Sequence, residues 1–360
     1  MALASLRRLS GSLIAAIMTL ALFLAAAGPA VADTGIRART AVVINAADGR
    51  ILYGKNPTLK VMPASTTKLM TAMVALDRLN PDAVTMISAT AAETPSVPPR
   101  VRAGERYRIR DLLHLALMRS VNSAAVALAE AAAGSEDAFA AMMNNKAAEI
   151  GASDTRFINA SGLPGEGQQI TAINLAGIMK HALGYPLIKE IINTRTAMVY
   201  SQDGRRLPLA NTNHLLITDD SIGGKTGYTR DAGHCLVSAA EKGGSLLVSV
   251  VLGEHVRNAI WDDSRAIVDS ASDVLAKNLA PVVYRTEVDE GPVVMASYKK
   301  SRAFAASRTA LAGDAAERPN YSAPKKYRHK SAKVRASAAR KAANERRYIQ
   351  RMKRKHGLAA

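Results

Sequence analysis

The sequence predicts an α/β protein of the α+β kind, in which an antiparallel sheet is flanked by helices. Apolar runs bounded by turn residues, typical of strands, lie near both ends of the region 40–280. Segments with apolar residues at helical spacing occupy its middle. Strands at both ends of a chain most simply share one antiparallel sheet, with the intervening helices packed against it. We therefore expect a single sheet built from both ends of the domain.

Two hairpins supply the predicted strands. In "TAVVINAADGRILYGKN", Ala41 to Ile44 and Ile51 to Tyr53 flank Asp48-Gly49, a strong short-range hairpin signal. Later in the chain, the apolar runs "HCLVSAA" and "SLLVSVVLG" are joined by "EKGG". This second pair also predicts an antiparallel hairpin.

Helical periodicity appears first from Ser65 to Leu79, just before Pro81. Further helices are predicted in "RDLLHLALM", "SAAVALAEAAAG", "SEDAFAAMMNNKAAEIGA", "TAINLAGIMKHAL" and "NAIWDDSRAIVDSASDVLAKNL". Gly134 has the character of a C-cap and Ser135 that of an N-cap. The segments "ETPSVPPRVRAGERYRI" and "SIGGKTGYTRDAG" are rich in Pro and Gly, and we expect both to be loops.

The first 32 residues read as an export signal. Arg7 and Arg8 precede an apolar run from about Ser12 to Ala27, and Ala30-Val31-Ala32 offers small residues where a signal peptidase cleaves. The alternative is an uncleaved membrane anchor, because the run is only marginally shorter than the ~20 residues needed to span a bilayer. We predict an exported protein of the periplasm or cell envelope, soluble or peripheral to the membrane.

The basic charge is concentrated at the C-terminal end. The chain carries a net charge of +18, and between Lys299 and Ala360 there are 19 Lys and Arg residues against three acidic residues. We expect three parts: a signal peptide (1–32), a catalytic domain (33–280) and a basic, disordered tail (281–360).

The tail has the charge of a nucleic-acid binder, but export argues against that partner. Anionic membrane lipids or acidic wall polymers fit better, and a solvated tail without a dedicated partner is the alternative. The tail has few large apolar residues on any helical face, which argues against deep membrane insertion.

The remaining reactive side chains suggest no cofactor. The single cysteine, Cys235, cannot form an intramolecular disulfide, and we expect it to be a small buried strand residue. The seven histidines show no HExxH or paired ligand spacing. We predict no metal and no other cofactor.

Chemistry is first suggested by "PASTTKLMTA", where Ser65 precedes Lys68 by three residues. On a helix such residues share a face, with Cβ atoms about 5 to 6 Å apart. A lysine kept neutral by burial or by a second cation can accept the hydroxyl proton. The pair alone does not decide against a polar helix start with a solvated lysine, because Ser297 to Lys300 and Ser322 to Lys325 repeat the spacing in or beside the tail.

Two further motifs change this interpretation. "SVN", Ser120 to Asn122, and "KTG", Lys225 to Gly227, each occur once. With Ser65 and Lys68 they match the signature shared by penicillin-binding proteins and class A β-lactamases. The flanking segments "SAAVALAEAAAGS", "FINASGLPG", "NTNHLL" and "GGKTGYTRDAGHCLVSAA" make residues 35 to 275 resemble the serine-type D-alanyl-D-alanine carboxypeptidases, the low-molecular-mass penicillin-binding proteins. This resemblance implies a β-lactamase/transpeptidase-like fold, with a helical subdomain beside the antiparallel sheet.

The resemblance also implies roles in catalysis. Ser65 would attack the carbonyl between two D-alanines of a peptidoglycan stem peptide, forming an acyl-enzyme that water then hydrolyses. Lys68 would take the Ser65 proton. Ser120 would relay a proton to the leaving amine, since an amine cannot depart as an anion. β-Lactams would acylate the same serine and inhibit the enzyme.

Five further residues are implied in substrate binding. Asn122 would hold the amide of the acyl chain and help to position Lys68. Lys225 would attract the terminal carboxylate, to which Thr226 would hydrogen-bond. Gly227 would let the substrate backbone approach, and the backbone N–H of Tyr228 would complete the oxyanion site with that of Ser65.

Three alternatives stay open. A class A β-lactamase is expected to carry a Glu-x-x-Leu-Asn element, which this chain lacks, so penicillin should acylate Ser65 and remain. A DD-endopeptidase acting on cross-links would use the same residues. An inactive wall-binding module would be expected to have lost a motif residue.

The chain departs from many relatives at Ser123, where they carry an acid, and after residue 280, where they continue into a second β-rich domain.

Overall fold

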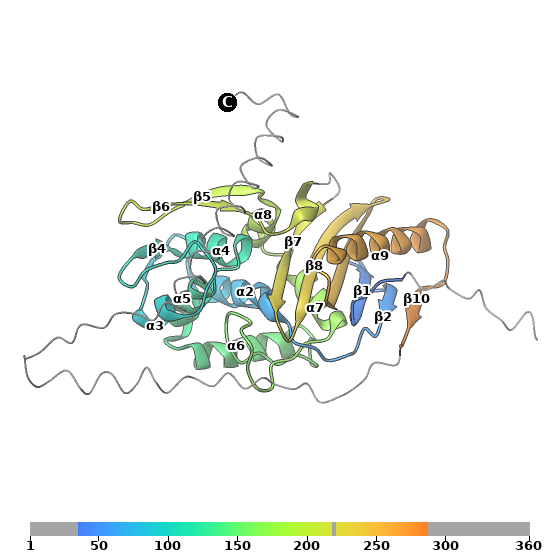
Figure 1. Ribbon diagram of the computed structural model, residues 1–360, viewed down its shortest axis with the longest axis horizontal. Helices are drawn as coiled ribbons and strands as arrows, with labels where there is room; N and C mark the ends of the chain where they lie inside the picture. The colour runs from blue at the N-terminus through green and yellow to red at the C-terminus, as the bar shows by residue number, and fades with distance from the viewer. Residues whose placement is uncertain (1–34, 218–220, 287–360) are drawn as a thin grey trace, which may run out of the picture. The chain divides into compact units, whose positions relative to one another are not determined.

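A six-stranded sheet forms the centre of the protein (Figure 1). The computed structural model describes residues 35–217 and 221–286, so the predicted signal and most of the predicted tail lie outside the described residues. The strand order is β10-β2-β1-β9-β8-β7. The strands are β1 (Thr40–Asn45), β2 (Ile51–Lys55), β7 (Ser221–Thr229), β8 (Gly233–Lys242), β9 (Ser245–Glu254) and β10 (Val282–Tyr284). Within this sheet, all pairs are antiparallel except β10 with β2.

Both predicted hairpins and the single shared sheet are confirmed. The N-terminal strand β1 pairs with β2 on one side and with the late strand β9 on the other. The β8–β9 turn is made by Gly243 and Gly244, with φ of +58° and +73°. Two successive positive φ angles are the requirement of a type I′ turn, which matches the twist of the strands it joins.

Helices cover both faces of the sheet. The α7 helix (Ala172–Ala182) and the α9 helix (Ala259–Ala276) both contact β1 and β9. Alternate residues of β1 serve the two layers, since Val42 belongs to the core cluster that includes α7 residues and Val43 to the cluster that includes α9 residues. Because both faces are covered, β1 is buried along its whole length.

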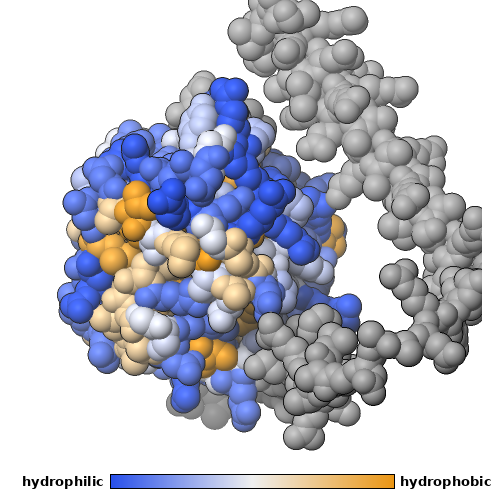
Figure 2. All heavy atoms as spheres, turned by 90° about the vertical axis from the view of Figure 1, so that its left-hand side faces the viewer, coloured by the Kyte–Doolittle hydropathy of each residue, from blue (hydrophilic) through white to orange (hydrophobic). Residues whose placement is uncertain are grey.

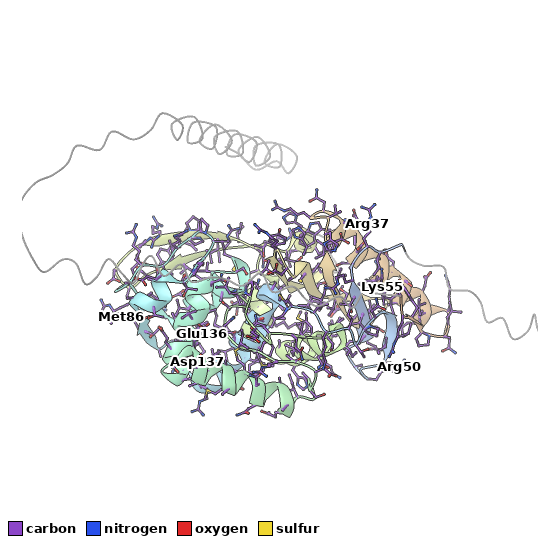
Figure 3. The ribbon with its side chains drawn as sticks, turned by 60° about the horizontal axis from the view of Figure 1, so that its bottom comes forward. Arg37, Arg50, Lys55, Met86, Glu136 and Asp137 are labelled. Carbon is purple, nitrogen blue, oxygen red and sulfur yellow. The ribbon has the colours of Figure 1, made fainter. Side chains whose placement is uncertain are left out.

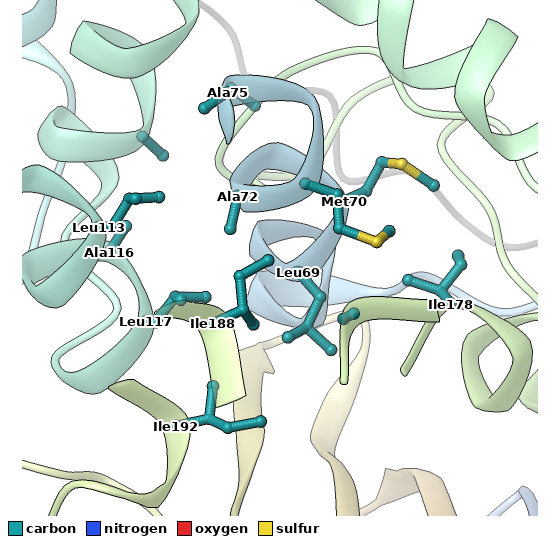
Figure 4. Packing of buried hydrophobic residues seen from close by; sticks show 14 of the residues in the cluster. Leu69, Met70, Ala72, Ala75, Leu113, Ala116, Leu117, Ile178, Ile188 and Ile192 are labelled. Atoms are coloured by element: carbon teal, nitrogen blue, oxygen red, sulfur yellow. The ribbon is translucent and has the colours of Figure 1, made fainter. Parts of the chain in front are cut away.

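The α2 helix (Lys68–Arg78) lies at the centre of the helical part of the fold and is buried over its first eight residues. The other helices of this part are α3 (Ala89–Glu93), α4 (Ile109–Met118), α5 (Asn122–Ala133), α6 (Glu136–Glu149) and α8 (Pro186–Asn193), of which α4, α5 and α6 contact α2. Figure 4 shows Leu69 among Leu117, Ile188 and Ile178, which come from α4, α8 and α7. Apolar side chains on all sides fix α2, and therefore its first residue, Lys68, within the core.

Two small sheets were not predicted. They pair β3 (Val84–Met86) with β4 (Arg106–Arg108), and β5 (Thr196–Tyr200) with β6 (Arg206–Ala210). β4 lies inside the segment predicted to be a loop. Figure 3 places Met86 at the end of the molecule opposite to Arg50 and Lys55, and Figure 2 shows apolar areas separated by hydrophilic side chains on that end. The exposed apolar side chains of these small sheets are Val84, Met86, Met198 and Tyr200.

The structure corrects the predicted loop around the Lys-Thr-Gly motif, which is strand β7. Two glycines misled the prediction. A Cβ at Gly223 would lie 2.6 Å from the Ile192 carbonyl oxygen, and one at Gly224 would overlap the Val237 carbonyl. These glycines therefore permit close packing of an extended strand rather than a turn.

The last strand, β10, lies in residues that the sequence analysis assigned to the tail. Its pairing with β2 extends the sheet past the predicted boundary at residue 280. The Asn56 side chain holds the chain just after β10. Its Nδ2 donates to Thr286 Oγ1 at 2.8 Å, and its Oδ1 accepts from the Thr286 N–H at 2.8 Å. Among residues 35–217 and 221–286, no helix combines the length and apolar composition that crossing a membrane requires.

Candidate active site

Ser65 lies in a single 3₁₀ turn, η1 (Ala64–Thr67), that leads directly into α2. The sequence predicted helix from Ser65 onward, and the structure begins the regular α-helix at Lys68. Ala64 has a positive φ of +48°, and Gly162 packs so closely against it that a Cβ would overlap the Ala64 carbonyl. The turn holds the partly exposed Ser65 at the end of a buried helix.

Lys68 is fully buried and its amine contacts three oxygens. Nζ lies 2.9 Å from Ser65 Oγ, and it donates to Asn122 Oδ1 at 2.6 Å and to the Ser161 carbonyl at 2.5 Å. Burial is the main cause that holds the pKa of Lys68 well below its ordinary value, and the nearby Lys225 lowers it further. The charge of Glu136, at the start of α6 beside Asp137 (Figure 3), opposes this shift.

The contacts of Lys68 leave a place for its lone pair once burial and Lys225 have favoured the neutral amine. A carbonyl oxygen can only accept a hydrogen bond. The two hydrogens of a neutral Lys68 are therefore taken by Asn122 Oδ1 and by the Ser161 carbonyl. In this neutral form the lone pair can accept from the Ser65 hydroxyl 2.9 Å away, whereas the protonated amine donates to the same oxygen. This arrangement gives Ser65 a base that can accept its proton.

A second serine–lysine pair lies opposite the first. Lys225, fully buried in β7, donates to Ser120 Oγ at 3.0 Å and to the Thr226 carbonyl at 2.6 Å. Burial lowers the pKa of Lys225 to about 7. Ser120 occupies the turn between α4 and α5 with a φ of +60°, an uncommon conformation for a residue with a side chain.

The β7 strand passes close to Ser65. A Cβ at Gly227 would lie 2.9 Å from the backbone nitrogen of Ser65, so only glycine leaves this approach free. Thr226 Oγ1 lies 2.6 Å from Thr212 Oγ1. Tyr228 is 60% exposed, and its ring stacks on that of His234 with centroids 4.4 Å apart.

The structure thus brings the predicted residues together from three segments. Ser65 and Lys68 come from η1 and α2, Ser120 and Asn122 from the α4–α5 turn, and residues 225–228 from β7. Sequence reasoning missed Thr212 and the Ser161 carbonyl. Both lie in segments that carried the family resemblance, "NTNHLL" and "FINASGLPG", but a backbone oxygen leaves no residue-type signal.

The cysteine lies outside this cluster. Cys235 is buried as predicted, and burial raises the pKa of its thiol to about 12. Within the part of the chain that the structure describes, no group of three or more His, Cys, Asp or Glu side chains is arranged to hold a metal ion.

The sheet with helices on both faces is the fold of the penicillin-binding proteins and DD-transpeptidases. The structure matches a crystal structure of a D-alanyl-D-alanine carboxypeptidase from Mycobacterium tuberculosis with a TM-score of 0.62 and 33% identity, covering 68% of this chain and 92% of that one. It matches a Streptomyces DD-transpeptidase with a TM-score of 0.61 and 28% identity, over 66% and 97% of the two chains.

Residues 27–256 match the sequence pattern of the D-alanyl-D-alanine carboxypeptidase family, peptidase S11. The chain belongs to this family. It is 32% identical to the D-alanyl-D-alanine carboxypeptidase DacF of Bacillus subtilis, over 69% of this chain and 66% of that protein. It is 33% identical to a D-alanyl-D-alanine endopeptidase of Escherichia coli, over 81% of this chain and 91% of that protein. The chain thus spans about two thirds of DacF and nearly all of the endopeptidase.

Proposed function

We propose that the protein is a serine D-alanyl-D-alanine carboxypeptidase that removes the terminal D-alanine from peptidoglycan stem peptides. The observation that carries the proposal is the environment of Lys68. Its amine is buried, lies 2.9 Å from Ser65 Oγ and has carbonyl acceptors for both hydrogens of its neutral form. Such an amine is suited to generating a serine nucleophile.

In the proposed acylation, Ser65 Oγ attacks the carbonyl carbon of the penultimate D-alanine while Lys68 Nζ takes its proton. A C–O bond forms, and the C–N bond to the terminal D-alanine then breaks. Ser120 delivers a proton to the departing nitrogen and takes the proton that Lys68 holds, so that D-alanine leaves as an amine and Lys68 is neutral again. Lys225, which donates to Ser120 Oγ, holds that hydroxyl in place. Water then attacks the ester carbonyl while Lys68 takes its proton, and as the bond to Ser65 Oγ breaks, this proton passes to Oγ and the shortened peptide leaves as a carboxylic acid.

The backbone around Ser65 supplies the proposed oxyanion site. The N–H groups of Ser65 and Tyr228 would donate to the carbonyl oxygen as it becomes negative. The close approach of Gly227 to the Ser65 nitrogen supports this pairing, because Tyr228 is the next residue of the same strand.

Recognition of the terminal carboxylate falls to Lys225 and Thr226. With a pKa of about 7, Lys225 is close to half protonated at neutral pH in the free protein. A bound carboxylate stabilises the charged form, so substrate binding itself would recruit the proton. Asn122 has a second amide hydrogen to offer the acyl chain.

A DD-endopeptidase activity is the second candidate. The similarity to the Escherichia coli endopeptidase, which extends over 81% of this chain, favours it. Both reactions cleave an amide on the carboxyl side of D-alanine and share the same chemistry. They differ in whether the leaving amine belongs to a free amino acid or to a cross-linked peptide.

We propose an exported protein of the periplasm or cell envelope, with residues 1–32 as its signal. The basic segment after residue 299 would associate with anionic lipid or acidic wall polymer. Both segments lie outside the described residues.

The test is the intact mass of the mature protein during incubation with benzylpenicillin, followed over hours and compared with Ser65→Ala. A persistent adduct on the wild type alone is the expected result. Rapid turnover of the drug would indicate a β-lactamase, and the absence of any adduct on the folded protein would indicate an inactive wall-binding module. Incubation with a pentapeptide and with a cross-linked muropeptide, read by mass spectrometry, then separates carboxypeptidase from endopeptidase.

A further inference from the structure

The loop of residues 94–100 holds Asn122 by two atoms. The Pro95 carbonyl accepts from Asn122 Nδ2 at 2.7 Å, and Ser96 Oγ accepts from the Asn122 backbone N–H at 2.8 Å. The same amide of Asn122 presents Oδ1 to Lys68 at 2.6 Å. One short loop therefore fixes both the main chain and the side chain of a residue that contacts the proposed base.

The Pro95 contact decides which way the Asn122 amide faces. A carbonyl can bind only the NH₂ end of an amide. With Nδ2 engaged by Pro95, Oδ1 must point toward Lys68. The opposite orientation would direct N–H groups at the lone pair of Lys68, which would block the base, and would also set two carbonyl oxygens against each other at Pro95.

Ser96 supplies a hydrogen-bond acceptor that the start of α5 lacks in its own sequence. The N-cap of this helix is Val121, which has no side chain able to accept a hydrogen bond. The backbone N–H groups in the first turn of a helix have no acceptor within that helix. The hydroxyl of Ser96, 26 residues earlier in the chain, binds the first of them. The start of α5, and Asn122 with it, is thus capped from the loop rather than from its own sequence.

Arg119 ties the loop to the far side of the same turn. Its guanidinium donates to the Pro98 carbonyl at 3.4 Å and to the Ala210 carbonyl of β6 at 3.3 Å. Ser120, the next residue, has the positive φ that unsupported residues avoid. The turn that carries both Ser120 and Asn122 is therefore clamped between the loop and β6.

We infer that Ser96 is a positioning residue for the reaction, acting through Asn122 to keep the amide oxygen on Lys68. This inference rests on the proposed function, because it assigns the loop a role in acylation of Ser65. Ser96 touches neither Ser65 nor Lys68 in the structure, and its effect must pass through Asn122.

The test measures the rate constant for acylation by benzylpenicillin, over a range of pH, in the full chain carrying Ser96→Ala. Losing one orienting hydrogen bond should slow acylation about tenfold per folded molecule. The acid limb of the pH profile should move to lower pH, since a mispositioned amide no longer favours the protonated form of Lys68. Ser96→Thr, which keeps a hydroxyl, should restore most of the rate.

Ser201→Ala is the matched control. Ser201 Oγ also accepts from a backbone N–H, that of Arg205 at 3.1 Å, but at the tip of the β5–β6 hairpin. Thermal unfolding of both variants corrects for a plain loss of stability, which lowers the folded fraction without moving the pH profile. Ser201→Ala should acylate at the wild-type rate.

A double-mutant cycle separates action through Asn122 from any other route. In an Asn122→Ala background, Ser96→Ala should change the acylation rate little, because the amide to be positioned is gone. If the two effects instead multiply, or if Ser96→Ala alone leaves rate and pH profile unchanged, the positioning role is refuted. Failure of the wild type to acylate at all would refute the proposed function itself, which keeps the two outcomes distinct.

Discussion

The hydroxyl oxygens of Thr212 and Thr226 lie 2.6 Å apart. Thr212 precedes the short η2 helix (His214–Ile217), and its backbone N–H is bound by the Met118 carbonyl at 3.1 Å. It is therefore held by α4 while it contacts β7. If Thr226 donates its own hydrogen to the substrate carboxylate, Thr212 must donate to Thr226, and one hydroxyl orients the other.

Thr212→Val should therefore weaken binding of the carboxylate without abolishing catalysis. The loss of one hydrogen bond predicts a rise in KM of about fivefold for a peptide ending in D-Ala-D-Ala, with kcat nearly unchanged. Steady-state kinetics of D-alanine release measure both constants. Thr85→Val, a similar change in the distant strand β3, is the control, and an equal rise in KM there would contradict the assignment.

The pKa of Lys225 predicts an alkaline limit to activity. Its amine is protonated below pH 7 and loses its charge above about pH 7, so attraction for the carboxylate weakens as the pH rises. The kcat/KM for the free peptide, which reports ionisations of the free enzyme, should decline above that pH. In Lys225→Arg the cation does not titrate, and the alkaline decline should move to higher pH even though the absolute rate is lower. An alkaline limb at the same pH in both proteins would assign it to another group.

Gly227→Ala should impair acylation far more than it impairs folding. The added Cβ would lie 2.9 Å from the Ser65 nitrogen and 3.1 Å from the Ala64 Cβ, so β7 or η1 must shift. A displacement of this kind near reacting atoms is expected to cost about a hundredfold in rate. Acylation rates by intact mass test this, with Gly177→Ala in α7, where a Cβ meets nothing, as the control. Wild-type acylation by the folded variant would show that the approach of β7 is not needed.

A buried pair of acids predicts how stability depends on pH. Glu254 ends β9 and is fully buried, and Asp263 in α9 is nearly so. Burial, followed by the hydrogen bond and charge of Glu254, raises the pKa of Asp263 to about 6. Between pH 3.8, the ordinary pKa of an aspartate, and about pH 6, Asp263 is protonated in the folded state and ionised in the unfolded chain. The contribution of protonated Asp263 to stability is therefore present at low pH and is lost as the pH rises through 6.

Asp263→Asn should therefore raise the urea midpoint at pH 8 relative to the wild type. An amide needs no proton to hydrogen-bond with a carboxylate. At pH 4.5 the advantage should disappear, because Asp263 of the wild type is then still protonated. Urea unfolding at the two values of pH is the measurement. An equal difference at both would attribute the change to packing.

Much of the fold was predictable because its signals are local. Asp48-Gly49 announced the first hairpin, and the hydroxyl of Ser135 caps α6 as expected by accepting from the Ala138 N–H. The β5–β6 hairpin was not found, because Pro208 stands between the buried Leu207 and Leu209 of β6 and argues against a strand. Strand β7 was predicted to be a loop because of Gly223 and Gly224. A glycine in the sequence does not reveal whether it bends the chain or lets a strand pack closely against its neighbours.

The candidate active site was also predictable only in part. Motif order predicted that Ser65, Lys68 and Asn122 would meet, and the structure joins them by hydrogen bonds. The sequence could not indicate that Ser96 caps a helix that starts 26 residues later, because nothing in residue type or spacing encodes a contact made across a loop. Backbone acceptors such as the Ser161 carbonyl are equally silent in sequence.

The strand order has a practical consequence for attaching probes. β10 and β7 form opposite edges of the six-stranded sheet, so five inter-strand spacings, about 24 Å in all, separate them. A dye, affinity handle or immobilising linker joined close to Val283, which is half exposed, would sit far from the catalytic strand. Because the native Cys235 thiol is buried, a cysteine introduced at Val283 would be the accessible one in the described domain. β-Lactam binding could then be followed on an oriented surface without obstructing the approach to Ser65.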